Sequence, residues 1–202
     1  LSLMGIETNF GNYLGKMDII SSLATLSFDK RRSEFFTSEL ITLLILFDKG
    51  VINQNNYLGS WAGAYGNFQF MPSTIKNYAI DYDNDKSINL KNIKDSFASA
   101  ANYLNQLGWD NNSPCFYKVE LIKETPHNYL NTSAKNIKHK KDISYLKKYV
   151  KNSEFLNKHY NLKAAIVTPD FDIIPDAKIL QPAYIVFDNY ELILKWNRSL
   201  RF

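Results

Sequence analysis

The residue pattern changes at Pro114, and this change most constrains the fold of the 202-residue chain. Before Pro114, apolar side chains recur with helical spacing in residues 33–48 and 95–107. After it, prolines divide the chain into short pieces in which apolar and β-branched residues cluster. The sequence therefore predicts an α+β protein that is predominantly α, with its helices concentrated in the first half.

Three segments are expected along the chain. Residues 1–112 form a helical core, residues 113–182 a small mixed α/β subdomain inserted into it, and residues 183–202 a strand segment that returns to the core. A short helix is expected over 74–79, and the lysine-rich stretch of the second segment reads as another helix. Strands are expected at 116–122, 164–168, 183–187 and 192–196, the last two joined around Asp188-Asn189.

The chain is mildly basic, with a net charge of +4 and a pI near 8.9. Its lysines concentrate between Lys135 and Lys163, a run that could attract nucleic acid, anionic lipid or an anionic cell-wall polymer. A solvated surface is the simpler interpretation of such a run. Because no nucleic-acid-binding module accompanies it, we expect no nucleic-acid partner.

Nothing in the sequence indicates a membrane span or a disulfide. The apolar run at 40–47 is too short to cross a bilayer, and Cys115 has no second cysteine to pair with. Residues 1–5 lack the basic start and apolar stretch of a signal peptide. Either an export signal lies upstream of the printed sequence or the protein stays inside the cell, and the sequence leaves both open.

Two motifs carry groups suited to chemistry on a polar ligand. Glu7 lies in a short apolar segment between Gly5 and Gly11, where apolar surroundings would raise the pKa of its carboxyl and keep it protonated near neutral pH. Most single glutamates are solvated surface residues, which is the alternative for Glu7. In residues 59–73, small residues permit close backbone packing, while Ser60 and Gln69 can bond a polar ligand or only local backbone.

An acidic segment resembles a calcium-binding loop. Residues 81–87 carry aspartate at the first, third and fifth positions and place the carbonyl of Ser87 at the seventh, as an EF-hand loop does. The segment departs from that pattern at Lys86, where glycine permits a sharp turn, and at Asn92, where glutamate is usual. An acidic, solvated turn without metal is the alternative.

Taken together, the motifs resemble the lytic murein transglycosylase B family. The matching segments, in order, are Gly5–Gly11, Ser22–Phe28, Arg31-Arg32, Gly59–Ser73, Ala100–Tyr103 and Lys195–Ser199. The agreement spans nearly the whole chain and is weakest between about 113 and 182. The resemblance implies a lysozyme-like catalytic core that binds glycan in a long groove, and peptidoglycan glycan strands as the partner.

In this family one glutamate serves as acid and base, and Glu7 occupies its position. The implied reaction cuts between N-acetylmuramic acid and N-acetylglucosamine and closes a 1,6-anhydro ring, without a catalytic cofactor. The substrate-binding positions that the resemblance implies are Arg31, Arg32, Ser60, Gln69, Tyr103, Trp196 and Asn197. The family also carries a single calcium loop with a later closing carboxylate, so a structural Ca²⁺ is expected on Asp81, Asp83, Asp85, Ser87 and Asp95.

The resemblance implies a monomer in the periplasm or at the outer membrane. It also implies helices on both sides of the matched motifs, whereas six residues precede Glu7 and the printed sequence ends at Phe202. A truncated, non-catalytic peptidoglycan-binding module is therefore one alternative function. Ordinary hydrolysis of the same bond, as by a muramidase, is another, and a stand-alone Ca²⁺ sensor is a more distant one.

Overall fold

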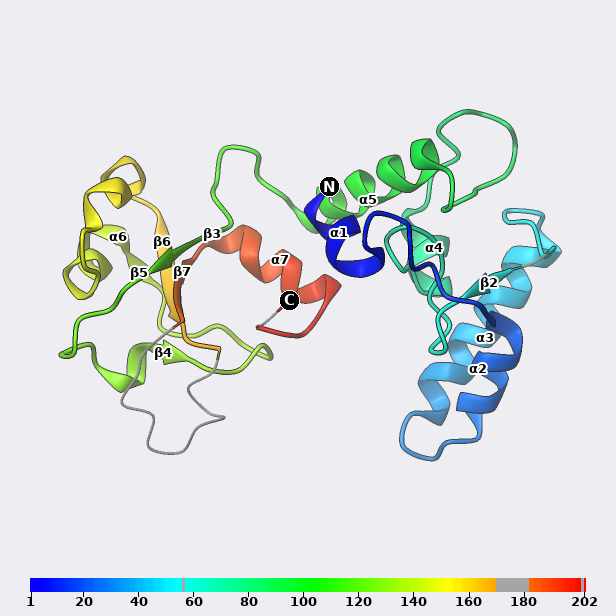
Figure 1. The fold of residues 1–202 in the computed structure, drawn as a ribbon, viewed down its shortest axis with the longest axis horizontal. Coiled ribbons are helices and arrows are strands. Elements are labelled where there is room, and N and C mark those ends of the chain that lie inside the picture. Colours follow the sequence, from blue (N-terminus) through cyan, green and yellow to red (C-terminus); the bar gives the residue numbers. More distant parts are fainter. Residues whose placement is uncertain (56, 170–181, 201) are drawn as a thin grey trace. The chain divides into compact units, whose positions relative to one another are not determined.

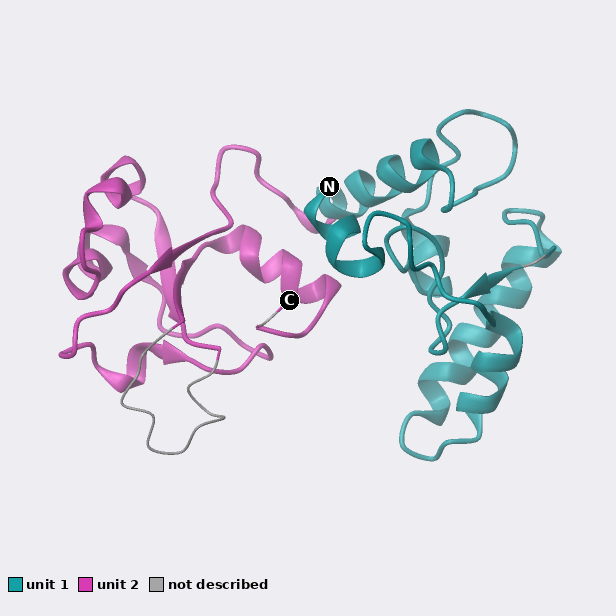
Figure 2. Ribbon diagram, in the orientation of Figure 1, with its two compact units in different colours: residues 1–106 teal, residues 107–202 magenta. Residues whose placement is uncertain are grey.

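The computed structural model describes residues 1–55, 57–169, 182–200 and 202, and these residues form two compact units (Figure 1). The first unit spans residues 1–106 and the second residues 107–202 (Figure 2). The expected boundary lay a few residues later, at 112. The predicted break at Pro175 lies outside the described residues.

The first unit is built from helices with one short β-ribbon. Strands β1 and β2 pair in antiparallel fashion, with Met17 opposite Gly59. Helices α2 and α3 form a hairpin, and α4 packs against α3 (Figure 1). The elements are α1 (Ser2–Thr8), β1 (Met17–Asp18), α2 (Ile19–Ser27), α3 (Ser33–Asp48), β2 (Leu58–Gly59), α4 (Pro72–Tyr78) and α5 (Ile93–Leu107).

Helix α3 has the predicted limits, but only part of its apolar surface is buried. Phe36, Leu43 and Leu46 are buried, whereas Phe35 and Leu44 are 39% and 48% exposed. The buried residues recur at i, i+7 and i+10, which places them on one side of the helix. Glu39 completes that buried face. The apolar residues of this helix surround more of its circumference than its core contact requires, so their pattern alone did not identify the buried side.

The second unit surrounds a mixed sheet. Strand β7 lies between β3 and β6 and is antiparallel to both, β4 joins β6 in parallel, and β5 pairs with β6 in antiparallel fashion. No helix in the described part of the chain is both long enough and apolar enough to span a membrane. The elements are β3 (Phe116–Val119), η1 (His127–Tyr129), β4 (Leu130–Asn131), β5 (Lys141–Asp142), α6 (Ile143–Leu146), η2 (Lys147–Tyr149), η3 (Ser153–His159), β6 (Lys163–Val167), β7 (Ala183–Val186) and α7 (Asp188–Trp196).

The two faces of this sheet bury two separate clusters. Alternate residues of a strand point to opposite faces. Ile166 and Ile185 therefore pack on one side with Leu146 of α6, and Val167 and Val186 on the other with Leu194 of α7. This arrangement explains why β6 and β7 read as continuous apolar runs.

The last segment differs from the prediction. Residues 192–196 belong to helix α7 instead of a strand, and β7 pairs with β3 and β6 within the second unit. Asn189 is buried at the start of α7, and its amide bonds the Asp110 N–H and C=O and the Ser113 carbonyl. These bonds fix the first turn of the helix where a hairpin turn was expected.

The lysine-rich stretch is also less helical than predicted. It contains the four-residue α6 and two 3-10 helices, η2 and η3. Asn152 adopts a left-handed conformation, with φ of 49°, between η2 and η3. Neighbouring lysines repel one another, and a left-handed residue ends a right-handed helix, so no single long helix forms.

Candidate active site

Glu7 lies in the last turn of α1 and is half-buried. The helix ends immediately after it, because the Asn9 and Phe10 N–H groups bond back to Gly5 and Met4 and both residues have positive φ. The Phe10 ring lies against Gly5, where a Cβ would come within 2.8 Å of it. The glycine thus lets the chain fold back beside Glu7.

The hydroxyl of Thr8 fixes this turn to the rest of the unit. Thr8 is 1% exposed, and its Oγ1 lies 2.9 Å from the carbonyl oxygen of Asn67 and 3.1 Å from that of Met4. The same oxygen accepts the Gly11 N–H at 3.0 Å. A helix of seven residues is not stable by itself in water. The Thr8–Asn67 bond therefore fixes the position of the residue next to Glu7.

Asn67 continues this connection toward the acidic loop. Its backbone N–H donates to the Leu90 carbonyl at 2.8 Å. Its side-chain nitrogen donates to the Lys91 carbonyl at 3.2 Å and to Ser96 Oγ at 3.0 Å. Sequence reasoning did not identify Thr8 or Asn67, although a small polar residue inside each of two recognised motifs was an available signal.

The loop between Gly59 and Gly66 is closed by its own backbone. Ser60 Oγ accepts the N–H groups of Ala62 and Ala64, and the Ser60 N–H donates to the Ala64 carbonyl at 2.9 Å. A Cβ on Gly15 would collide with the Gly59 carbonyl, so two backbone segments cross in direct contact. Ser60 thus serves local backbone, and its hydroxyl proton is still available to donate.

Gln69 and Tyr103 are also placed by contacts within the first unit. Gln69 has φ of 51°, and its side-chain nitrogen donates to the Gly66 carbonyl at 2.9 Å. The ring of Tyr103 lies 4.4 Å from that of Tyr78 and is edge-on to Phe70. Burial, with a smaller effect from Tyr78, raises the pKa of the Tyr103 hydroxyl, which stays protonated and able to donate.

The remaining predicted substrate positions are divided between the two units. Arg31 and Arg32 are exposed between α2 and α3, and the Arg32 guanidinium lies 4.4 Å above the Phe35 ring. Trp196 and Asn197 are half-buried at the end of α7, in the second unit. A common groove for these four residues and Glu7 stays a prediction.

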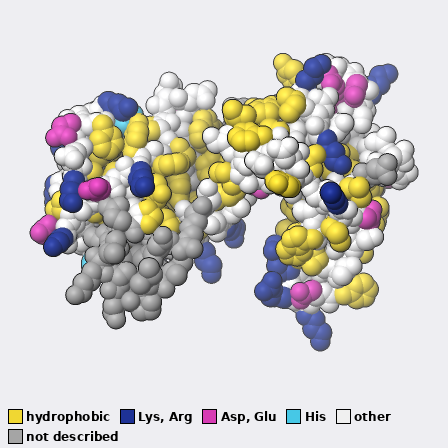
Figure 3. Space-filling model, in the orientation of Figure 1, with side chains coloured by type: hydrophobic (Ala, Val, Ile, Leu, Met, Phe, Trp, Pro, Cys, Tyr) yellow, Lys and Arg dark blue, Asp and Glu magenta, His cyan; other side chains and the backbone are white. Residues whose placement is uncertain are grey.

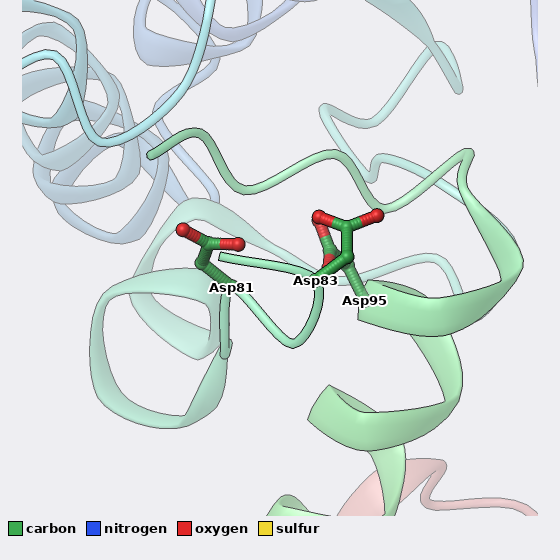
Figure 4. Close-up of side chains that lie close together, drawn as sticks. All are labelled: Asp81, Asp83 and Asp95. Carbon is green, nitrogen blue, oxygen red and sulfur yellow. The ribbon is translucent and has the colours of Figure 1, made fainter. Parts of the chain in front are cut away.

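The acidic loop gathers three carboxylates. Asp81, Asp83 and Asp95 each offer an oxygen, and these oxygens all lie within 4.8 Å of one another (Figure 4). Asp95 is fully buried and accepts the N–H groups of Tyr82 and Asn89 at 2.9 Å. Within the described residues, Asp83 Oδ1 is buried without a hydrogen-bond partner. Three converging carboxylates with an unsatisfied buried oxygen fit a hard divalent cation such as Ca²⁺.

Of the other predicted ligands, Asp85 lies outside this group of three carboxylates, and a role for the Ser87 carbonyl stays a prediction. Asp85 is exposed and its carboxylate accepts the Ser87 N–H at 2.9 Å. Lys86, which stands where the EF-hand pattern has glycine, has a φ of 73°, the left-handed conformation for which glycine is preferred. The Asp81 carboxylate accepts the N–H of Lys86 at 2.9 Å, which offsets part of that strain.

Glu39 is a buried carboxylate that the sequence did not reveal. It is 4% exposed, and its two oxygens accept the N–H and hydroxyl of Ser73 at 2.8 and 2.6 Å. The bonds join α3 to the first turn of α4, directly after the segment that carries Gln69. The sequence did not indicate that Glu39 joins two helices, because a glutamate in a helix usually faces solvent.

A mainly helical unit, in which the turn after Glu7 is bonded to Asn67 directly after a glycine-rich loop, fits the architecture of a lysozyme-like domain. The chain belongs to the transglycosylase SLT domain family, whose model matches residues 1–202. The membrane-bound lytic murein transglycosylase B of Escherichia coli K12 is 44% identical over 110 residues, which are 54% of this chain and 30% of that protein. The resemblance seen in the motifs is therefore confirmed.

Solved lytic transglycosylase structures share the fold. Pseudomonas aeruginosa SltB3, in complex with NAG-NAM-pentapeptide, matches with a TM-score of 0.82 and 29% identity over 97% of this chain and 50% of that one. Escherichia coli Slt35, in complex with calcium, matches with a TM-score of 0.74 and 29% identity over 98% and 59%. The predicted α+β, lysozyme-like fold class is confirmed, and the chain spans about half the length of these relatives.

Proposed function

We propose that this chain is a peptidoglycan lytic transglycosylase that uses Glu7 as its single acid and base. The bond cut is the one between N-acetylmuramic acid and N-acetylglucosamine. The observation that carries the proposal is the position of Glu7: half-buried at a helix end, beside a turn that Thr8 and Asn67 fix in place. Family membership and the glycan ligand of the SltB3 complex support the same substrate class.

The proposed reaction needs two proton transfers, one from Glu7 to the leaving oxygen and one from the substrate back to Glu7. Protonated Glu7 donates its proton to the glycosidic oxygen while the bond from the muramic acid C1 to that oxygen breaks. The substrate acetamido group stabilises the positive charge that develops at C1. The Glu7 carboxylate then takes the proton of the muramic acid O6 hydroxyl as O6 bonds to C1. Because O6 is already tethered to the reacting sugar, its effective concentration exceeds that of water.

Nearby polar groups suit the binding of the acetamido sugar. Among the described contacts the Ser60 oxygen only accepts, so its hydroxyl can donate to the sugar, and burial raises the pKa of the Tyr103 hydroxyl further above neutral pH. The side-chain nitrogen of Gln69 is already engaged with backbone, so we propose that its carbonyl oxygen faces the ligand. Each such bond orients the sugar and contributes about 0.5–1.5 kcal/mol.

The test is Glu7→Gln with purified sacculi as substrate. The amide keeps the shape of the side chain and cannot give up a proton, so we expect cleavage to fall at least about 100-fold while sacculus binding persists. Glu34→Gln is the matched control, since Glu34 is exposed in the first turn of α3. Products of the wild-type chain should be lighter than the hydrolysed sugars by one water molecule.

The other outcomes distinguish the alternatives. Reducing ends of full mass would show hydrolysis, as by a muramidase. Binding without any cut by the wild-type chain would show a non-catalytic module. A Glu7→Gln protein that cuts at the wild-type rate would refute the assignment of Glu7.

We also propose that Asp81, Asp83 and Asp95 hold a structural Ca²⁺, as the calcium complex of Slt35 and the unsatisfied Asp83 oxygen support. The ion would stabilise the loop through its charge and takes no step in the reaction. We further propose that the chain acts as a monomer in the cell envelope, where its substrate is found. The name of the Escherichia coli relative, a membrane-bound enzyme, supports that location.

A further inference from the structure

Three tyrosines and a lysine form an exposed group on the second unit, which we call the tyrosine–lysine patch. It consists of Tyr129 at the end of η1, Tyr145 in α6, and Lys148 and Tyr149 in η2. The three rings lie within 6.0 Å of one another, centroid to centroid. Two segments, with Tyr129 sixteen or more positions before the other three residues, thus converge on one surface point.

One of the three phenol O–H groups of the patch is not used in the hydrogen bonds among the tyrosines. Tyr145 Oη lies 3.1 Å from Tyr129 Oη and 3.4 Å from Tyr149 Oη. Each phenol carries one proton. Two hydrogen bonds among three hydroxyls use two protons, so one O–H is left to donate outward whichever way the bonds run. An acceptor on a ligand is the complement of such a group.

The ammonium group of the patch makes the preferred acceptor an anion. Lys148 Nζ lies 3.8 Å from the centre of the Tyr145 ring and 4.9 Å from that of Tyr149. Within the described part of the chain, ion pairs form at Lys140 and Lys151 but not at Lys148. Lys148 is therefore held in place by the rings and the hydroxyls of Tyr145 and Tyr149, and no described carboxylate compensates its charge.

The surroundings of the patch have the same sign of charge. Residues 118–163 hold eleven lysines against four acidic residues. Figure 3 shows basic side chains, with some acidic ones, interspersed with hydrophobic side chains over the visible face of this unit. Such a surface attracts anions from a distance, and the aromatic rings add contact with sugar faces or apolar side chains.

We propose that the tyrosine–lysine patch is a second binding site for peptidoglycan, one that holds a carboxylate of its peptide chains. The inference rests on the proposed function for its choice of ligand. A carboxylate has two oxygens, which can accept from the free phenol O–H and from the Lys148 ammonium together. The pentapeptide in the SltB3 complex is a ligand of this chemistry, since a peptide ends in a carboxylate. A site of this kind retains the enzyme on its polymer between cuts.

The test compares two lysines of the same unit. Lys148→Met and Lys118→Met lower the net charge equally, but exposed Lys118, on β3, lies outside the patch. We measure binding of each full chain, with Glu7→Gln added to prevent cutting, to sacculi and to a soluble pentapeptide. Lys148→Met should weaken both about three- to fivefold, the size of one exposed charge contact, and Lys118→Met should leave them nearly unchanged.

Amidating the peptide carboxylates should remove the difference between wild type and Lys148→Met. Equal losses from both lysine variants, or none, would overturn the proposal. Binding to anionic vesicles or polyphosphate that depends on Lys148 as strongly as peptide binding does would overturn it too, in favour of a general anion surface. Cutting of sacculi is measured separately with Glu7 intact, so failure of the activity and failure of the patch are distinguishable.

Discussion

Replacing Thr8 with valine should separate the positioning of Glu7 from the stability of the fold. Valine has nearly the same shape and lacks the hydroxyl. The substitution leaves the Gly11 N–H without its acceptor and the Asn67 carbonyl without its donor, in a side-chain site that is 1% exposed. An unsatisfied buried group costs about 1–3 kcal/mol. Because Gly11 is only partly buried, we expect a total near 2 kcal/mol.

The loss of the Thr8 hydrogen bonds should also slow the cleavage reaction. Glu7 is one residue from the missing bond, and a displacement of about 1 Å at a catalytic group can cost about 100-fold in rate. We expect the folded fraction of Thr8→Val to cut sacculi at least about tenfold more slowly. Thr8→Ser, which restores the hydroxyl, should recover most of that rate.

Thr125→Val is the matched control. Thr125 is also buried, at 2% exposure, and donates to the Ile122 carbonyl at 2.7 Å in the second unit. Its substitution should lower the melting temperature without slowing cleavage by the folded protein. Thermal unfolding gives stability and anhydro-product release gives rate. If Thr8→Val slows cleavage no more than Thr125→Val does, the Thr8–Asn67 bond does not position Glu7.

Three other predictions follow from described contacts. Millimolar Ca²⁺ should raise the melting temperature of chelator-stripped protein, and Asp83→Asn should abolish the shift; an equal shift in the variant would exclude this site. Gln69→Ala and Asn197→Ala should each lower the cleavage rate of correctly folded protein severalfold, as measured by product release. Burial, with a smaller effect of Lys158, lowers the pKa of His159, whose ring bonds the Tyr117 hydroxyl at 2.9 Å. Its contribution to stability is therefore present above the ordinary pKa of 6.5 and lost as the pH falls through the lowered pKa, and His159→Gln should flatten that part of the unfolding profile.

The sequence predicted the elements whose local pattern and core contact agree. Helix α3 has the predicted limits, and α5 begins two residues earlier than expected, because regular spacing and clear ends define both. Strands β6 and β7 were found because a sheet covered on both faces needs continuous apolar runs. The conformation of the elements that were predicted wrongly depends on tertiary contacts. The buried bonds of Asn189, which made α7 a helix, join residues about 80 positions apart and leave no local trace.

The sequence of α7 nevertheless contains features that indicate a helix. Tyr190 and Leu194 stand four residues apart, acidic residues occupy its first turn, and Lys195 lies in its last, as the helix dipole favours. The sequence analysis instead assigned the apolar run at 192–194 to a strand over 192–196. In the proposed site, the motifs predicted Glu7, but the groups that fix its turn, Thr8 and Asn67, act through backbone partners that a motif does not display.

The crossing of Gly15 and Gly59 has a consequence for the energetics of ligand capture. The loop from Gly59 to Gly66 is tied by Ser60, by the crossing backbone and by the mutual bonds of Tyr65 and Phe70. Ordering a free loop on association would cost about 1–2 kcal/mol of conformational entropy for each residue fixed. Here that loss is already incurred during folding. A glycan that binds this loop would therefore lose less binding free energy to loop ordering. The entropy cost lowers the stability of the folded chain instead of its affinity for the ligand.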